Sequence, residues 1–292
     1  MYESDGITPI QGARVVAEIR LPNGDWVGGG TYTLADGNYT IVDLLSSDYR
    51  VRVKKPGFAY EYYDSKYVYA AGDKVTVTEG TNTPDINFTL DAGGAVTGHV
   101  YEEDGVTPIS GVDLAVWLPT GEWVSYFPWT EHDGSYILWL RTGSYVIGTA
   151  SGGIGGKYVD EWYDDHYDMK NATPVQVVAP HDTSGIDFYL AKAGSISGHV
   201  YEEDGVTSIA GASVYAFPTI GDHPGSGANT ASDGSYTIEG LPSGHYRVQA
   251  TVSGHESQFY HSAADEASAT AVTVNAPNDT PDVDFALNPV SE

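Results

Sequence analysis

The most acidic stretch of the chain, KYVDEWYDDHYDMK at 157–170, holds the side chains best suited to bind a metal ion. Calcium takes about six to eight oxygen ligands, several of them carboxylates, from a loop that can wrap around the ion. The spacing differs from the EF-hand pattern, and the corresponding stretches at 60–67 and 258–266 contain fewer acids. The segment is interpreted either as a calcium site or as a solvated acidic loop. Its candidate ligands are Asp160, Glu161, Asp164, Asp165 and Asp168.

Tryptophans form the second group of candidate binding residues. Five of the six tryptophans fall between residues 117 and 162, in a stretch that is also rich in acids. Exposed aromatic rings beside acids can stack on sugar rings, and exposed apolar patches also mark contacts between proteins. The residues are interpreted either as glycan contacts or as side chains that pack against a neighbouring domain or another chain. They are Trp117, Trp123, Trp129 and Trp139.

Motifs for catalysis and for phosphate binding are absent. The segment SGGIGGKY at 151–158 has Ser151 and Tyr158 where a phosphate-binding loop requires a glycine and a Ser or Thr. The sequence contains no nucleophile elbow or Ser-His-acid motif, and its nine histidines show no metal-ligand spacing. We therefore expect a protein that is not an enzyme.

Composition argues against several partners. The chain has 40 acids and 13 bases, for a net charge of −27. Nucleic acid and anionic membrane surfaces require clustered Lys and Arg, so neither is an expected partner. There is no cysteine, and therefore no disulfide framework. No apolar run approaches the roughly 20 residues of a membrane span, so no membrane insertion is expected.

The chain repeats itself. The residues GHVYEEDGVT occur at 98–107 and again at 198–207, and a diverged copy, MYESDGIT, stands at residues 1–8. A period of about 100 residues is the size of a whole small domain rather than of a solenoid unit. We predict three domains, called here the first, second and third repeat. Their predicted bounds are 1–94, 95–193 and 194–292.

Each repeat has the pattern of an all-β domain. Apolar residues alternate with others at 114, 116 and 118, and again at 136, 138 and 140, which places them on a core face. Trp117 and Trp139 fall on the opposite phase, where the first repeat has Glu18 and Asp43, and are expected to face outward. Asp-Gly turns separate the segments. About seven short strands per repeat, in a two-sheet sandwich, are predicted.

These repeated motifs resemble the carboxypeptidase regulatory-like domain. The resemblance implies seven-stranded transthyretin-like sandwiches in tandem, and the repeats are also similar to the B-type repeats of bacterial collagen adhesins and pilins. It further implies an extracellular structural or binding role rather than catalysis. The matching residues of the third repeat are Gly198, Val200, Asp204, Gly205, Ile209, Gly211, Val214, Asp233, Gly234, Tyr236, Ile238, Leu241, Gly244, Tyr246, Val248, Asp284, Phe285 and Leu287.

Repeats of that kind often carry a Lys–Asn isopeptide bond between their first and last strands. The first strands here, GAVTGHV and GSISGHV, contain no lysine. Asp187 and Asp284 occupy the last-strand position where the first repeat has Asn87. No isopeptide bond is therefore expected.

The first repeat lacks most of its first strand. Aligned on GHVYEEDGVT, Met1 falls where Val100 falls in the second repeat. Two interpretations remain open: the chain is a segment of a longer array, or a neighbouring subunit supplies the strand, because an unpaired edge beside a buried face invites pairing.

We predict an elongated rod of three sandwiches at the cell surface or outside the cell. The expected function is that of a structural repeat: a stalk, an adhesin segment or a filament subunit, stabilised by calcium and assembling by strand donation. Its expected partners are other protein subunits, including further copies of itself, or surface glycans. The alternatives are a carbohydrate-binding module that uses the tryptophans of the second repeat, or accessory domains of a secreted hydrolase.

Overall fold

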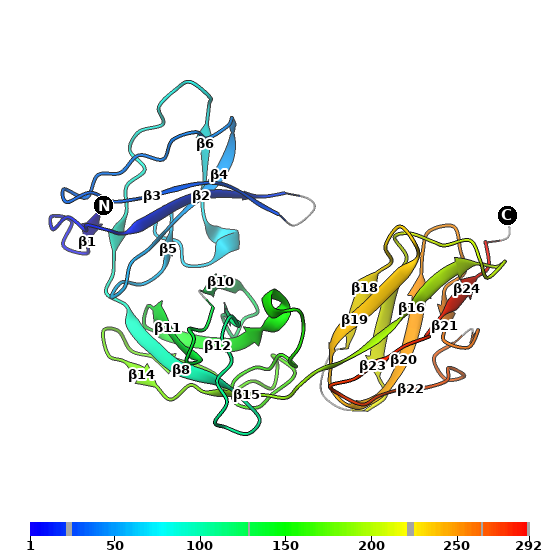
Figure 1. The fold of residues 1–292 in the computed structure, drawn as a ribbon. Helices are drawn as coiled ribbons and strands as arrows, with labels where there is room; N and C mark the ends of the chain where they lie inside the picture. The colour runs from blue at the N-terminus through cyan, green and yellow to red at the C-terminus, as the bar shows by residue number, and fades with distance from the viewer. Residues whose placement is uncertain (22–24, 128, 221–224, 264, 291–292) are drawn as a thin grey trace.

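The computed structural model of the protein describes residues 1–21, 25–127, 129–220, 225–263 and 265–290. Its regular structure is almost entirely β-strand, with two short 3₁₀ turns, η1 (Tyr69–Ala71) and η2 (Ser151–Ile154). The predicted all-β fold is confirmed. The second repeat lies between the first and the third in space as well as in sequence (Figure 1). Within the described residues, no helix is long and apolar enough to cross a bilayer.

The second and third repeats are built alike, each from two sheets. One sheet of the second repeat has the order β10-β9-β12-β13, and the other has β8 between β11 and β14, with β15 also pairing β8. In the third repeat the corresponding orders are β18-β17-β20-β21, with β22 on β20, and β19-β16-β23, with β24 on β16. The first and last strands of each unit run parallel and adjacent, as Val100 pairs with Phe188 and Val200 with Phe285.

The strands of these two repeats have the following bounds. In the second they are β8 (Gly94–Glu102), β9 (Asp113–Trp117), β10 (Trp123–Phe127), β11 (Ser135–Leu140), β12 (Gly143–Ala150), β13 (Val175–Val177), β14 (Thr183–Ser184) and β15 (Phe188–Leu190). In the third they are β16 (Gly194–Glu202), β17 (Ser213–Pro218), β18 (Ser226–Asn229), β19 (Ser235–Leu241), β20 (Gly244–Thr251), β21 (Gln258–Phe259), β22 (Val272–Val274), β23 (Asp279–Thr280) and β24 (Phe285–Leu287).

The first repeat has one complete sheet and one remnant. In the complete sheet β2 lies between β3 and β4, and β4 also pairs β5 and β6. Among the described residues of this repeat, β1 and β7 alone form the other sheet, with two paired positions. The first strand of this repeat, β1, covers two residues, whereas β8 and β16 cover nine each. The bounds are β1 (Tyr2–Glu3), β2 (Arg14–Arg20), β3 (Trp26–Tyr32), β4 (Ser47–Lys54), β5 (Glu61–Tyr62), β6 (Lys74–Val77) and β7 (Thr89–Leu90).

Alternation in sequence produces the cores. Leu114 and Val116 on β9 and Leu138 on β11 are fully buried between the two sheets of the second repeat, as the period-two pattern predicts. Ile238 and Phe285 occupy the corresponding core of the third repeat. The first repeat has its own cluster, which includes Met1. Each repeat therefore buries a separate apolar core.

A buried threonine ties the turn regions of every repeat. The hydroxyl of Thr130 donates to the carbonyl of Ile109 at 2.7 Å and accepts from the backbone N–H of Val112 at 3.1 Å. Thr33 and Thr230 make the same pair of bonds in the other repeats. Because buried polar groups are costly unless paired, this recurring tie explains how a hydroxyl is accommodated in each core.

Short bridges fix the connections between the repeats. Ala59 N–H donates to the Asp91 carbonyl at 3.0 Å, and Gly93 N–H donates to the Gly57 carbonyl at 2.9 Å. At the next connection Ala193 N–H donates to the Lys157 carbonyl at 2.9 Å. The residues that link one repeat to the next are thus bonded to the repeat that precedes them. The bounds at 94/95 and 193/194 remain predictions.

Candidate functional site

Two carboxylates of the acidic segment bond to the body of the second repeat. The Oδ1 atom of Asp160 accepts from Ser151 N–H at 2.6 Å and from the Thr149 hydroxyl at 3.2 Å. Glu161 is buried, and its Oε1 accepts from Tyr189 N–H at 3.0 Å. These two side chains therefore have structural partners within the fold.

The other three carboxylates lie nearer the solvent. Asp164 and Asp165 are exposed, and the Oδ1 atom of Asp168 accepts from Lys170 N–H at 3.0 Å. Among the residues that the structure describes, no three His, Asp or Glu side chains come together in a way that would hold a metal ion. Calcium binding by this segment stays a prediction.

A buried glutamate recurs in the first two repeats. Burial raises the pKa of Glu61 to about 7, with Asp91 adding to the shift, and burial raises the pKa of Glu161 to about 7 as well. Tyr62, Trp162 and Phe259 begin the same small turn in the three repeats. Gln258, which precedes Phe259, therefore corresponds to Glu61 and Glu161. A neutral amide at this position agrees with the raised pKa values of the two carboxyls, since burial disfavours the charged form.

A groove of about 900 Å³ opens on the first repeat. Its floor includes Ala17, Tyr49, Val51 and Val75, all core residues. Its two rims are residues 37–45 and 77–87. The hydroxyl of Tyr39 donates to the carbonyl of Ile86 and connects these rims. The rim at 37–45 contains no strand, although the corresponding segment of the second repeat forms β11.

The other repeats show what fills this space. In the second repeat the segment Gly94–His99 of β8 runs between β11 and β14, and Val96 is fully buried. Ile196 takes the same place in the third repeat. A Cβ atom on Gly98 would lie 1.8 Å from the Ile186 carbonyl oxygen, so glycine is required there. His99 N–H then donates to Asp187 Oδ1 at 2.8 Å.

A second site lies where the first and second repeats meet. Trp123 packs against two rings of the first repeat, with centroid distances of 6.4 Å to Trp26 and 5.2 Å to Tyr69. The guanidinium carbon of Arg141 lies 4.1 Å from the centroid of the Tyr67 ring. These contacts favour the interpretation of Trp123 as a residue that packs against a neighbouring domain.

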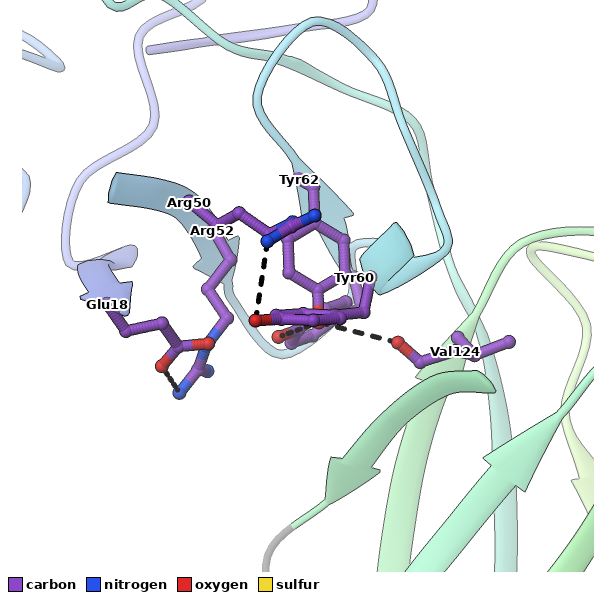
Figure 2. Close-up of polar contacts among 7 residues, drawn as sticks. Glu18, Arg50, Arg52, Tyr60, Tyr62 and Val124 are labelled. Atoms are coloured by element: carbon purple, nitrogen blue, oxygen red, sulfur yellow. Dashed lines mark hydrogen bonds and ion pairs between the residues drawn. The ribbon is translucent and has the colours of Figure 1, made fainter. Parts of the chain in front are cut away.

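Two tyrosines of the first repeat enter the core of the second. Tyr60 and Tyr62 are buried within the same apolar cluster as Val124 and Leu138. Figure 2 shows Tyr62 directed toward Val124, and its hydroxyl donates to the Val124 carbonyl at 3.4 Å. Tyr60 N–H donates to the Trp139 carbonyl at 3.3 Å. The core of the second repeat therefore extends into the first repeat through these two side chains.

An ion pair supports the tyrosines from the first-repeat side. Arg52 donates through Nε to Glu18 Oε1 at 2.7 Å and through Nη2 to Glu18 Oε2 at 2.8 Å, on adjacent strands β4 and β2 (Figure 2). The Arg52 guanidinium carbon also lies 5.8 Å from the centroid of the Tyr60 ring. Bidentate geometry of this kind orients an arginine more firmly than a single bond does.

The remaining candidate tryptophans differ in their surroundings. Trp117 is half-buried and lies opposite Trp123 in the β9–β10 pairing. Trp129 is 65% exposed, and Trp139 is half-buried beside the first repeat. Trp139 lines a cleft of about 280 Å³ that both repeats form. The full lining is Gly12, Arg14, Tyr32, Lys54, Lys55, Pro56, Phe58, Tyr60, Ile137 and Trp139.

Sequence reasoning did not identify the first-repeat side of this contact. Tyr60 and Tyr62 belong to the stretch YEYYDSKY at 60–67, which was considered for its few acids. The high density of aromatic residues in this stretch was a usable signal of a contact. The concentration of basic residues in the first repeat, which includes Arg14, Lys54 and Lys55 of the cleft, was also visible in the sequence. Eight of the 13 Lys and Arg residues fall in the first 94 positions. Which bases share a cleft depends on how the repeats meet.

Residues 195–288 match the family model of the carboxypeptidase regulatory-like domain, the family that the motifs predicted. This match covers the third repeat, and the first two repeats carry variants of the same motifs. No curated protein matches the chain in sequence.

The solved structures that match the chain are distant from it both in sequence and in superposition. The Bacillus anthracis TIE protein is 14% identical, with a TM-score of 0.29 and 98% of this chain covered, and the chain spans about half (49%) of its length. A streptococcal ancillary pilin is 12% identical, with a TM-score of 0.30 and coverage of 100% of this chain and 98% of the pilin. The minor pilin of Streptococcus agalactiae is 16% identical, with a TM-score of 0.30 and coverage of 68% and 97%.

Proposed function

We propose that this protein is a non-catalytic structural repeat of the cell surface or extracellular space, and that its first repeat is an acceptor for a β-strand from a neighbouring subunit. The observation that carries the proposal is the open groove of the first repeat, because both sister repeats fill the same space with a strand. Tandem sandwiches joined by short bonded connections suit a stalk, an adhesin segment or a filament subunit. Pilins are among the distant structural matches of the chain.

The sister repeats define what the donor strand must look like. The sequences of Gly94–His99 and Gly194–His199, GAVTGH and GSISGH, share the pattern Gly-x-Val/Ile-x-Gly-His. The branched residue enters the core, and the second glycine avoids a carbonyl oxygen that would lie 1.8 Å or 2.2 Å from a Cβ atom. Strand addition supplies main-chain hydrogen bonds for affinity and a side-chain pocket for specificity.

A peptide binding experiment tests the proposal. A labelled peptide with the sequence GGAVTGH is expected to bind the 292-residue chain, as measured by fluorescence anisotropy. A matched variant carries GAVTGH fused directly before Met1, so that its groove is filled in cis, and it should not bind the peptide. A control peptide with valine in place of the second conserved glycine, GGAVTVH, should bind neither protein.

The same experiment can contradict the proposal. Equal binding of the peptide to the native and the extended chain would place it outside the groove, and no binding to the folded native chain would show that the groove accepts no such strand. Thermal unfolding of the extended chain gives an independent measure, because a filled groove should stabilise the first repeat relative to the native chain.

Calcium enters this proposal as a stabiliser of the assembled form. Light scattering after size exclusion, with calcium and then with EDTA, separates its contribution from that of the strand. Oligomers that disappear in EDTA would support a role for Asp164, Asp165 and Asp168. Oligomers that are indifferent to EDTA, and absent only in the extended chain, would assign assembly to the groove alone.

A further inference from the structure

The cleft between the first and second repeats concentrates positive charge in a strongly acidic protein. Its lining includes Arg14, Lys54 and Lys55, three of the 13 bases in a chain of net charge −27. Arg14 and Lys54 are direct cross-strand neighbours on β2 and β4. Like charges in such a pair are destabilising. The pair therefore lowers the free energy of unfolding of the first repeat, and other interactions must compensate for this loss.

Comparison within the chain shows that the fold does not need these bases. The cross-strand pair that corresponds to Arg14 and Lys54 is Asp113 and Ala150 in the second repeat. In the third repeat it is Ser213 and Thr251. Since the three sheets are otherwise built alike, the requirements of folding do not explain the two positive charges. The charges therefore indicate a different role in the first repeat.

The charge is only partly compensated by the surroundings. The negative charge of Glu18 favours the charged form of Lys54, but both carboxylate oxygens of Glu18 accept hydrogen bonds from Arg52. Burial, together with the nearby charges of Arg52 and Arg14, lowers the pKa of Lys54. An anion bound between Arg14, Lys54 and Lys55, which line the same cleft, would reduce the repulsion among their positive charges.

Aromatic rings supply the rest of the cleft. Tyr32 is 61% exposed, Phe58 and Trp139 are half-buried, and Tyr60 forms the buried end. The backbone bond from Tyr60 N–H to the Trp139 carbonyl holds the two repeats together at this point. Apolar faces with a few convergent polar groups are the usual composition of a small-molecule site, and about 280 Å³ is close to the lower limit of such sites.

We propose that this cleft binds an anionic sugar ring, with its carboxylate or sulfate between Arg14, Lys54 and Lys55 and its C–H face on Trp139 or Tyr32. A ring with one charge fits better than a long polyanion, because the surface beyond the cleft belongs to a chain with 40 acids. Partly exposed aromatic faces suit a sugar, which keeps its other face in water. This site is independent of strand acceptance by the groove.

The test is a titration of the full chain, with digalacturonate, a neutral galactose disaccharide and a sulfated monosaccharide as the probes, followed by calorimetry and by tryptophan fluorescence. Digalacturonate is expected to bind, the neutral disaccharide at least about tenfold more weakly, and binding should weaken as salt rises. Preference for the sulfated sugar over digalacturonate would assign the anion as sulfate rather than carboxylate.

Matched variants localise the binding. The double variant Arg14→Ser with Lys54→Thr carries the pair that the third repeat already tolerates, so it should fold, and its affinity should fall at least about tenfold. Trp139→Leu should give a comparable loss, and Lys74→Gln, an exposed base outside the cleft, should give none. Unchanged affinity in the double variant, equal binding of the neutral disaccharide, or no binding of either anionic sugar to the folded chain would overturn the proposal.

Discussion

Replacing Tyr62 with alanine is expected to destabilise the first repeat by about 3–5 kcal/mol and to uncouple its unfolding from that of the second. Tyr62 is 1% exposed, and it is a buried member of the core cluster of the second repeat although it belongs to the first. Its removal leaves a cavity at the contact and also deletes the hydroxyl that bonds to Val124. The substitution should therefore lower the stability of both repeats.

Differential scanning calorimetry of the full chain measures this effect. The native chain is expected to show the first two repeats unfolding together, and Tyr62→Ala should split off an earlier transition. Phe259→Ala is the matched control, because Phe259 occupies the corresponding turn of the third repeat and is also buried. It should lower only the transition of the third repeat. If both variants shifted the same single transition, the proposed coupling between the first two cores would be wrong.

Replacing Glu161 with glutamine is expected to stabilise the second repeat at neutral and higher pH, by on the order of 2–3 kcal/mol. Burial raises the pKa of this carboxyl from its ordinary value of 4.5 to about 7. Between these two pH values the folded chain holds a proton that the unfolded chain has released. The free energy of unfolding therefore falls as the pH rises from about 4.5 to about 7, and it stays low above that range.

Denaturant unfolding at a series of pH values tests this prediction. The glutamine variant should lose the part of the pH dependence that falls between pH 4.5 and 7, because its amide does not titrate. Gln258 shows that the fold accepts an amide in this position. The control is Glu131→Gln, at an exposed position, which should leave the profile unchanged. A glutamine variant with the native pH profile would show that Glu161 is ionised at neutral pH.

The fold was accessible from the sequence because its signals are local and repeated. Alternation at 114–118 and 136–140 depends only on which face of a strand a side chain occupies, and the Asp-Gly turn at 133–134 immediately precedes the second of these strands. The missing strand of the first repeat was equally visible, because two other copies of the motif could be aligned with Met1. Three copies in one chain gave comparisons that a single domain does not offer.

The sites were less accessible because they depend on how repeats meet. Alternation predicted that Trp117 and Trp139 lie away from the core, and both are half-buried rather than fully exposed, Trp139 because the first repeat covers it. The density of aromatic residues at 60–67 indicates a contact, but it does not indicate that the rings of Tyr60 and Tyr62 enter the core of another repeat. The pairing of Arg14 with Lys54 requires the register of β2 and β4, which the sequence alone does not specify.

The parallel pairing of first and last strands has a mechanical consequence. When the two ends of the second or third repeat are pulled apart, β8 slides against β15, or β16 against β24, so their hydrogen bonds are loaded together in shear. In the described part of the first repeat, the corresponding strands pair at two positions, Tyr2 with Thr89 and Glu3 with Leu90. In a single-molecule pulling experiment the first repeat should yield first, and GAVTGH fused before Met1 should raise the force at which it yields.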